Sequence, residues 1–318
     1  MRALALAGVL AATGCAATPA SPAAGTTAAG ATGAATGLQA TARAATAPGR
    51  CADDAGWNDP ATPRHVHGST WYVGTCGITA LLVTSDAGHV LLDAGTAEAA
   101  PQVMANIRAL GFRVEDVRYL LSSHAHVDHA GGFAALQRAS GATLVALDAA
   151  LPALRSGLST PADPQHGALP DFTGVGTGAT RPIADGDVLR LGPLAFTAHA
   201  TPGHAPGGTS WTWRSCEAGA CLDIAFVDSL TAVSAPTYRF SDAASHPQVL
   251  PAFEASFGRV RALPCDLLLT PHPRASALWS RLGPGATRPL AEPGACLAYA
   301  DAAERRLEFR LAEERATP

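Results

Sequence analysis

The chain of 318 residues contains no lysine, because all 22 of its basic residues are arginine. This absence excludes mechanisms that need a lysine, such as Schiff-base formation or phosphate binding by a P-loop. Charged residues make up only 15% of the chain, aromatic residues 6%, and the formal net charge is −4. A mildly acidic chain with few aromatic side chains lacks both the basic surface and the stacking surface that nucleic-acid binding requires. We therefore expect no nucleic-acid partner.

The N-terminus has no apolar run long enough for a transmembrane helix. Residues 1–14 contain one arginine and a short apolar stretch, which is typical of a secretory signal. Small residues directly precede Cys15, and this pattern resembles a bacterial lipoprotein signal in which Cys15 becomes the lipid anchor. Simple cleavage nearby is the alternative. The sequence thus predicts export to the periplasm, either free or tethered to the membrane through Cys15.

Large apolar side chains are almost absent from residues 15–50, which consist mainly of Ala, Thr, Gly, Ser and Pro. Such a segment cannot bury enough surface to offset the entropy lost on ordering, so we expect a flexible tether. The folded domain is therefore expected to span residues 51–318. We expect it to be a monomer.

The chain has seven cysteines, and an oxidising compartment makes disulfides plausible. Setting Cys15 aside leaves six, which allow 15 pairings. A thiol metal site is the competing interpretation, but the sequence has no C-x-x-C pair. Proximity in sequence favours three pairs, which are Cys51 with Cys76, Cys216 with Cys221, and Cys265 with Cys296.

After residue 70, strand-like apolar runs alternate with segments that have helical spacing. Strands are expected within 70–84 (a hairpin), 89–93, 117–121, 143–147, 188–200, 210–214, 222–227 and 266–270. Helices are expected at 101–110, 132–139, 250–262 and 298–312. Residues 155–181 are rich in Gly and Pro and are expected to form a long loop. The alternation predicts a layered α/β domain with helices outside the sheets.

The most informative stretch follows the expected strand at 117–121 and holds His124, His126, Asp128 and His129. Imidazole and carboxylate groups are ligands that suit zinc. In an extended segment alternate side chains share a face, which places His124 beside His126. Asp128 and His129 follow where the chain turns into a helix, so they can point to a second locus.

Two further histidines occupy similar positions. His204 lies in a Gly/Pro turn between two expected strands, and His272 follows a strand directly between two prolines. Together with the first cluster this makes six candidate ligands, too many for one tetrahedral zinc with an open position. Six ligands suit two metals with three protein ligands each, which leaves room for a bridging hydroxide and a substrate.

With these residues the sequence resembles the metallo-β-lactamase superfamily. The hallmark of that superfamily is an H-x-H-x-D-H motif, which His124, His126, Asp128 and His129 match. More narrowly, the sequence resembles subclass B3 through residues 70–74, 128–132, 228–230 and 263–273. The resemblance extends over nearly the whole chain after Cys51. It implies an αββα four-layer sandwich with the active site at one edge between the two sheets.

The resemblance also implies specific roles. One zinc would bind His124, His126 and His204, and the other would bind Asp128, His129 and His272. The same three disulfides are implied. The implied reaction is hydrolysis of penicillins, cephalosporins and carbapenems, which confers antibiotic resistance. A metal-bound hydroxide would attack the lactam carbonyl, and Asp128 would orient it as a catalytic residue. Because the chain has no lysine, Ser229, Thr231 or an arginine would bind the substrate carboxylate.

Asp228 keeps an alternative open. Thioester and lactone hydrolases of the same superfamily, such as glyoxalase II and lactonases, place in this region an aspartate that bridges both metals. Asp228 would be that residue in such an enzyme, whereas the B3 resemblance makes Ser229 the equivalent position. A non-catalytic binding protein on the same scaffold is a third interpretation, and it would be expected to have lost ligands that this chain retains.

Overall fold

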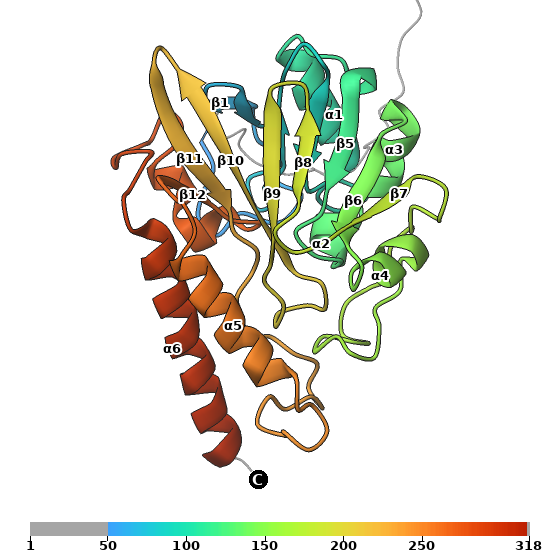
Figure 1. The fold of residues 1–318 in the computed structure, drawn as a ribbon, viewed down its shortest axis with the longest axis vertical. Helices are drawn as coiled ribbons and strands as arrows, with labels where there is room; N and C mark the ends of the chain where they lie inside the picture. Colours follow the sequence, from blue (N-terminus) through green and yellow to red (C-terminus); the bar gives the residue numbers. More distant parts are fainter. Residues whose placement is uncertain (1–49, 317–318) are drawn as a thin grey trace, which may run out of the picture. The chain divides into compact units, whose positions relative to one another are not determined.

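Two β-sheets face each other in the structure, a computed structural model that describes residues 50–316 (Figure 1). The expected signal, the tether and Cys15 lie outside the described residues, apart from Arg50. The first sheet has the order β1 (Arg64–His67), β2 (Thr70–Tyr72), β3 (Leu81–Val83), β4 (His89–Leu92), β5 (Val117–Leu121), β6 (Thr143–Leu147), β7 (Thr180–Ile183). The second has the order β12 (Leu267–Leu269), β11 (Ala220–Phe226), β10 (Thr209–Glu217), β9 (Leu194–Ala200), β8 (Val188–Leu191).

Helices cover the outer faces of both sheets. Two longer helices, α1 (Ala100–Ala109) and α3 (Phe133–Ser140), pack on the first sheet. Another pair, α5 (Val249–Arg261) and α6 (Ala295–Ala316), lie side by side against the second sheet (Figure 1). The short helices α2 (Val127–Ala130) and α4 (Leu151–Ser156) lie in the connections. This arrangement confirms the predicted αββα sandwich. Among the described residues, no helix is both long and apolar enough to cross a membrane.

The apolar strands explain why both faces of each sheet must be covered. In β3, Leu81 and Val83 point into the core between the sheets, while Leu82 points to the outer helices. At the end of β11, Phe226 faces the inner core and Val227 faces α5 and α6. Side chains alternate between the two faces along a strand. A strand that is apolar at every position is therefore stable only where both faces of the sheet are buried.

The segment expected as one strand at 188–200 is a hairpin instead. Strands β8 and β9 pair antiparallel around a turn at Gly192, whose φ of +56° favours glycine. Within the expected loop 155–181 the chain finishes α4 and begins β7. Apolar residues lie on both sides of the turn, so periodicity alone does not mark it, whereas the dipeptide Gly192-Pro193 is a turn signal.

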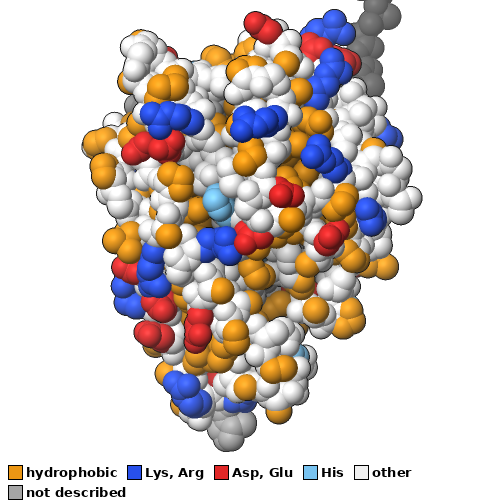
Figure 2. All heavy atoms as spheres, in the orientation of Figure 1, with side chains coloured by type: hydrophobic (Ala, Val, Ile, Leu, Met, Phe, Trp, Pro, Cys, Tyr) orange, Lys and Arg blue, Asp and Glu red, His pale blue; other side chains and the backbone are white. Residues whose placement is uncertain are grey.

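Three disulfides lie in the described part of the chain, and they join the pairs that sequence proximity favours. They fit a protein that folds in an oxidising compartment. On the face shown in Figure 2, basic and acidic side chains are intermixed and scattered over hydrophobic and neutral surface. That face therefore lacks the continuous basic area that nucleic-acid binding requires.

Candidate metal centre

The predicted ligands come together at one edge of the sandwich, although their elements are distant in sequence. Strands β4 and β5 run parallel, as do β11 and β12, so the loops after their carboxyl ends meet at this edge. His124 and His126 follow β5, and Asp128 and His129 lie in α2. His204 lies between β9 and β10, and His272 follows β12. Their potential ligand atoms form two groups, His124 with His126 and His204, and His124 with Asp128 and His129.

In the first group, a hydrogen bond fixes one nitrogen of each imidazole. His124 Nδ1 is 2.7 Å from Asp228 Oδ1, and His126 Nε2 is 2.8 Å from Asp163 Oδ2. His204 Nδ1 is 2.8 Å from the carbonyl oxygen of Thr231. A partner on one ring nitrogen sets the tautomer and directs the other nitrogen to a metal. These three partners therefore leave His124 Nε2, His126 Nδ1 and His204 Nε2 as the available ligand atoms.

The contacts of these inner nitrogens fit a metal. His124 Nε2 is buried and finds no hydrogen-bond partner among the described residues. His126 Nδ1 and His204 Nε2 have only long contacts, at 3.5 and 3.4 Å, with the amide nitrogen of Gln165. A buried imidazole nitrogen without a good partner is costly, and a bound cation would supply the missing interaction.

The second set of ligand atoms has the spacing of a metal site. Asp128 Oδ2 lies 3.2 Å from His129 Nε2 and 3.3 Å from His272 Nε2, and the two nitrogens are 3.2 Å apart. Ligands at about 2.0–2.1 Å in a tetrahedron around zinc are separated by about 3.3–3.4 Å. These three atoms thus have the mutual distances that one face of such a tetrahedron requires, which brings His272 within reach of the predicted second metal.

Burial and the repulsion between neighbouring imidazoles keep His124 and His204 neutral. Burial lowers the pKa of His124 well below its usual range, and the neighbouring rings lower it further. Burial and His126 lower the pKa of His204 to about 3. A metal ligand must be deprotonated, so these two side chains are in the binding form at neutral pH.

Asp128 and His129 form an ion pair in the metal-free protein. Burial alone would raise the pKa of Asp128, but the adjacent His129 lowers it overall. Burial would lower the pKa of His129, but Asp128 outweighs burial and raises it to about 10. A metal that binds here must therefore displace the proton of His129.

Asp228 lies outside both groups of ligand atoms. It contacts the outer nitrogen of His124, and its Oδ2 lies so close to Gly208 that a Cβ there would be 2.4 Å away. Burial raises the pKa of Asp228 well above its usual range. Ser229 is buried next to it, and Thr231 is half-buried with its hydroxyl 3.1 Å from His204 Nδ1.

Two carboxylates at the site were not predicted from the sequence. Asp163 comes from the loop after α4, where the Gly/Pro-rich sequence gives no periodic signal that would place it. Asp93 has a φ of +56°, and it lies 3.5 Å from His129 Nδ1 and accepts bonds from the backbone and hydroxyl of Ser123. Its position before Ala-Gly at a strand end is a signal that could have identified it.

The comparisons with known proteins agree with this geometry. A family model described as "Metallo-beta-lactamase superfamily" matches residues 73–272. The metallo-β-lactamase SMB-1, solved with 2-mercaptoethanesulfonate, is 47% identical with a TM-score of 0.77, covering 82% of this chain and 100% of that one. MIM-1 from Novosphingobium pentaromativorans is 49% identical with a TM-score of 0.78, covering 82% of this chain and 93% of that one.

Two further relatives widen the comparison. MEM-A1, a subclass B3 metallo-β-lactamase from a soil metagenome library, is 46% identical with a TM-score of 0.78, covering 83% of this chain and 100% of that one. A curated protein of Burkholderia pseudomallei (strain 1710b), named "Probable metallo-hydrolase", is 32% identical over 143 residues. That match spans 42% of this chain and about half, 46%, of the relative. The fold, the convergent ligands and the matched family model together show that this chain belongs to the metallo-β-lactamase superfamily.

Proposed function

We propose that this protein is a dizinc β-lactamase of the B3 type, which hydrolyses penicillins, cephalosporins and carbapenems and thereby confers antibiotic resistance. The triangle formed by Asp128, His129 and His272, next to the three imidazoles of the first group, carries this proposal. The identity of 46–49% to the metallo-β-lactamases SMB-1, MIM-1 and MEM-A1 supports it. The zinc assignment rests on the all-imidazole and carboxylate donor set.

Some residues of the site would bind the metals, and others would orient the reactants. Two zinc ions bound here would supply a water molecule ionised at neutral pH and positive charge where the lactam nitrogen departs. Asp128 directs Oδ2 to the second group, which leaves Oδ1 to accept a hydrogen bond from the attacking water and hold it in line. The outer partners of His124, His126 and His204 keep the rings fixed while charge develops.

Hydroxyl groups take the place of the absent lysine in binding the substrate carboxylate. Ser229 and Thr231 follow β11 at the same edge as the ligands, and the Thr231 hydroxyl lies beside His204. A hydroxyl can donate to a carboxylate oxygen without bringing a charge into the site. We propose that Ser229 and Thr231 bind this group and so align the lactam carbonyl with the attacking water.

The contacts of Asp228 favour a β-lactamase over a thioester or lactone hydrolase. In the rival proposal Asp228 would bridge both metals. Here its Oδ1 contacts the outer nitrogen of His124, on the side of the ring away from the inner nitrogens, and Oδ2 is enclosed against Gly208. This placement supports a role in orienting His124.

A substrate panel with metal analysis tests the function. The purified, oxidised protein should contain two zinc ions per chain, and it should hydrolyse a carbapenem and a chromogenic cephalosporin. A thioester and a lactone serve as the competing substrates. Cleavage of either without turnover of any β-lactam would transfer the assignment to the rival hydrolase, and absence of a metal pair would refute both.

We also propose that residues 1–14 direct export to the periplasm, residues 15–50 form a tether, and residues 51–318 form the catalytic domain. The three disulfides support an oxidising compartment. Mass spectrometry of the mature protein after expression with labelled fatty acid would test the anchor. Label at Cys15 supports lipidation, whereas an unlabelled N-terminus near that residue indicates simple cleavage.

A further inference from the structure

His272 is the least enclosed of the six candidate ligands. Its side chain is 36% exposed, whereas the other five residues are buried. Its Nε2 faces Asp128 and His129 over 3.3 and 3.2 Å, so Nδ1 is the ring nitrogen left to face the backbone of Gly77. The other rings are held by other elements, so the orientation of His272 depends on where Gly77 lies.

Gly77 belongs to the turn between β2 and β3, which we call the 73–79 turn. Internal hydrogen bonds shape it, including Thr75 N to Ile78 O at 3.0 Å. At its end, Thr79 N donates to the carbonyl of Pro271 over 2.8 Å. The turn therefore contacts the His272 segment twice, once through its backbone at residue 77 and once through the residue before the histidine.

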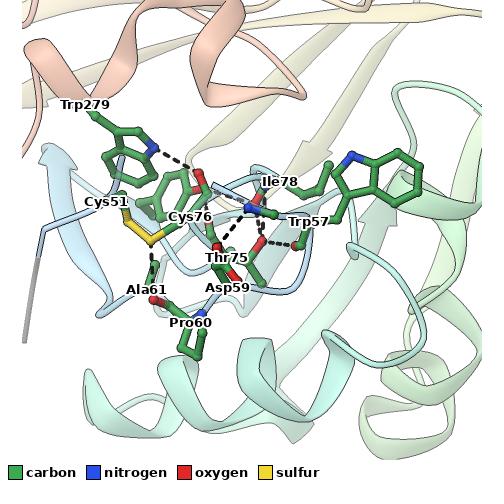
Figure 3. The surroundings of a disulfide bond; sticks show 12 residues. Cys51, Trp57, Asp59, Pro60, Ala61, Thr75, Cys76, Ile78 and Trp279 are labelled. Atoms are coloured by element: carbon green, nitrogen blue, oxygen red, sulfur yellow. Dashed lines mark hydrogen bonds between the residues drawn. A yellow bond between two sulfur atoms is a disulfide. The ribbon is translucent and has the colours of Figure 1, made fainter. Parts of the chain in front are cut away.

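The 73–79 turn is also fixed through Cys76. Its sulfur is bonded to Cys51, its N–H donates to Asp59 O over 2.8 Å, and its carbonyl accepts from Trp279 Nε1 over 2.9 Å. Figure 3 shows the disulfide with Trp279 on one side and Pro60 on the other. Since Cys76 is adjacent to Gly77, these bonds limit movement of the Gly77 carbonyl.

The disulfide joins two backbones that pack with no space for a side chain. A Cβ at Gly77 would lie 2.4 Å from the carbonyl oxygen of Gly56. Residues 51–61 have no regular secondary structure, so they depend on such contacts and on the disulfide to stay against the 73–79 turn. Removing the cross-link would loosen this segment and give the turn more freedom.

We propose that the Cys51–Cys76 disulfide and Gly77 position His272, and so set the affinity of the second metal site without changing the first. This inference rests on the proposed dizinc function. The chain of contacts runs from the disulfide to Cys76, to the Gly77 backbone, to His272 Nδ1. Loss of a partner that orients a metal-bound histidine costs about 10- to 100-fold in metal affinity. Because the disulfide acts through the turn, its loss should cost about 10-fold, the low end of that range.

The double variant Cys51→Ser/Cys76→Ser tests this inference in the full-length protein. Stepwise zinc affinities, measured by competition with a chromophoric chelator, should show the second affinity reduced about 10-fold and the first unchanged. The matched control is Cys216→Ser/Cys221→Ser, which removes the disulfide between β10 and β11 at the end of β11 opposite Asp228. This control should keep both affinities, because it contacts no candidate ligand.

A second variant covers the case in which the double variant fails to fold. Trp279→Phe keeps the disulfide and removes only the N–H that donates to the Cys76 carbonyl. We expect its second-zinc affinity to fall about two- to fivefold, as for one lost hydrogen bond. Unchanged second-zinc affinity in the double variant, or in Trp279→Phe where the double variant does not fold, would overturn the inference. Equal losses at both sites would also overturn it.

The outcomes separate this inference from the proposed function. A wild-type protein that binds no zinc pair refutes the function itself, before any variant is compared. A wild-type protein that binds two zinc ions and hydrolyses β-lactams, with variants that bind the second zinc equally well, refutes only the positioning role.

Discussion

The two halves of the metal centre are built differently. The first, formed by His124, His126 and His204, is all imidazole. Two carboxylates and a backbone carbonyl, from the connection after α4 and the connection after β11, hold its rings. The second contains the carboxylate of Asp128 and the partly exposed His272, whose ring faces the backbone of Gly77 and, within residues 50–316, no second carboxylate. The difference indicates that the first half is preorganised, whereas the second depends on the surrounding loops.

The two halves also differ in the charges of their ligand side chains in the metal-free protein. Burial keeps the imidazoles of His124 and His204 neutral without metal, whereas Asp128 and His129 already neutralise each other as an ion pair. A cation entering the first half meets free lone pairs, but one entering the second half must displace a proton. We therefore expect the first zinc to bind more tightly than the second at neutral pH.

The largest expected effect is that of Asp128→Ala. It removes a ligand and the group that orients the attacking water, so kcat/KM should fall by more than about 100-fold, the most that loss of an outer partner costs. Metal content should fall from two zinc ions toward one, because the first half keeps its three imidazoles. The exposed Asp86→Ala is the control, and unchanged turnover in Asp128→Ala would contradict the assigned role.

The second-largest expected effect is a different pH dependence of zinc affinity in the two halves of the metal centre. His129 has a pKa raised to about 10 and carries a proton at neutral pH. Second-zinc affinity should therefore rise with pH, by up to about tenfold per unit below that pKa. The lowered pKa values of His124 and His204 mean that the first zinc displaces no proton from them.

Calorimetry in buffers of different ionisation enthalpy measures this difference directly. At pH 6, where ionisation of bound water contributes little, the second binding step should release about one proton more than the first. Equal release in the two steps would show that the Asp128–His129 ion pair does not form in the metal-free protein.

Much of this comparison could be predicted from the sequence, because its chemistry lies in periodic or clustered residues. The alternation within β3 requires two covered faces, and His124 and His126 follow a clear strand. The residues that orient the candidate ligands were harder to predict from the sequence. Asp163 lies in a loop whose sequence has no periodicity. Gly77 acts through its backbone, which the identity of a side chain does not reveal. Contacts between loops depend on tertiary packing, which local sequence patterns do not predict.

A smaller effect is expected from Asp228→Asn, which tests the support of His124. The amide keeps the shape and an acceptor but is a weaker partner, so first-zinc affinity should fall about 10-fold. In the metal-free protein the same change replaces a buried carboxyl whose pKa burial has raised. Metal-free thermal unfolding should therefore be unchanged or shifted upward. A drop in second-zinc affinity alone would contradict the placement of Asp228 outside the metal pair.

The smallest effect is expected from Thr231→Val, which removes a hydroxyl but leaves the carbonyl that holds His204 Nδ1. The shape is kept, so both zinc affinities should stay as in the wild type. Loss of one hydrogen bond to the substrate carboxylate should raise KM by about two- to tenfold with little change in kcat. Steady-state kinetics on a carbapenem measure this split. If first-zinc affinity fell instead, the Thr231 hydroxyl would help to orient His204, whose support would then include a side chain as well as the backbone carbonyl.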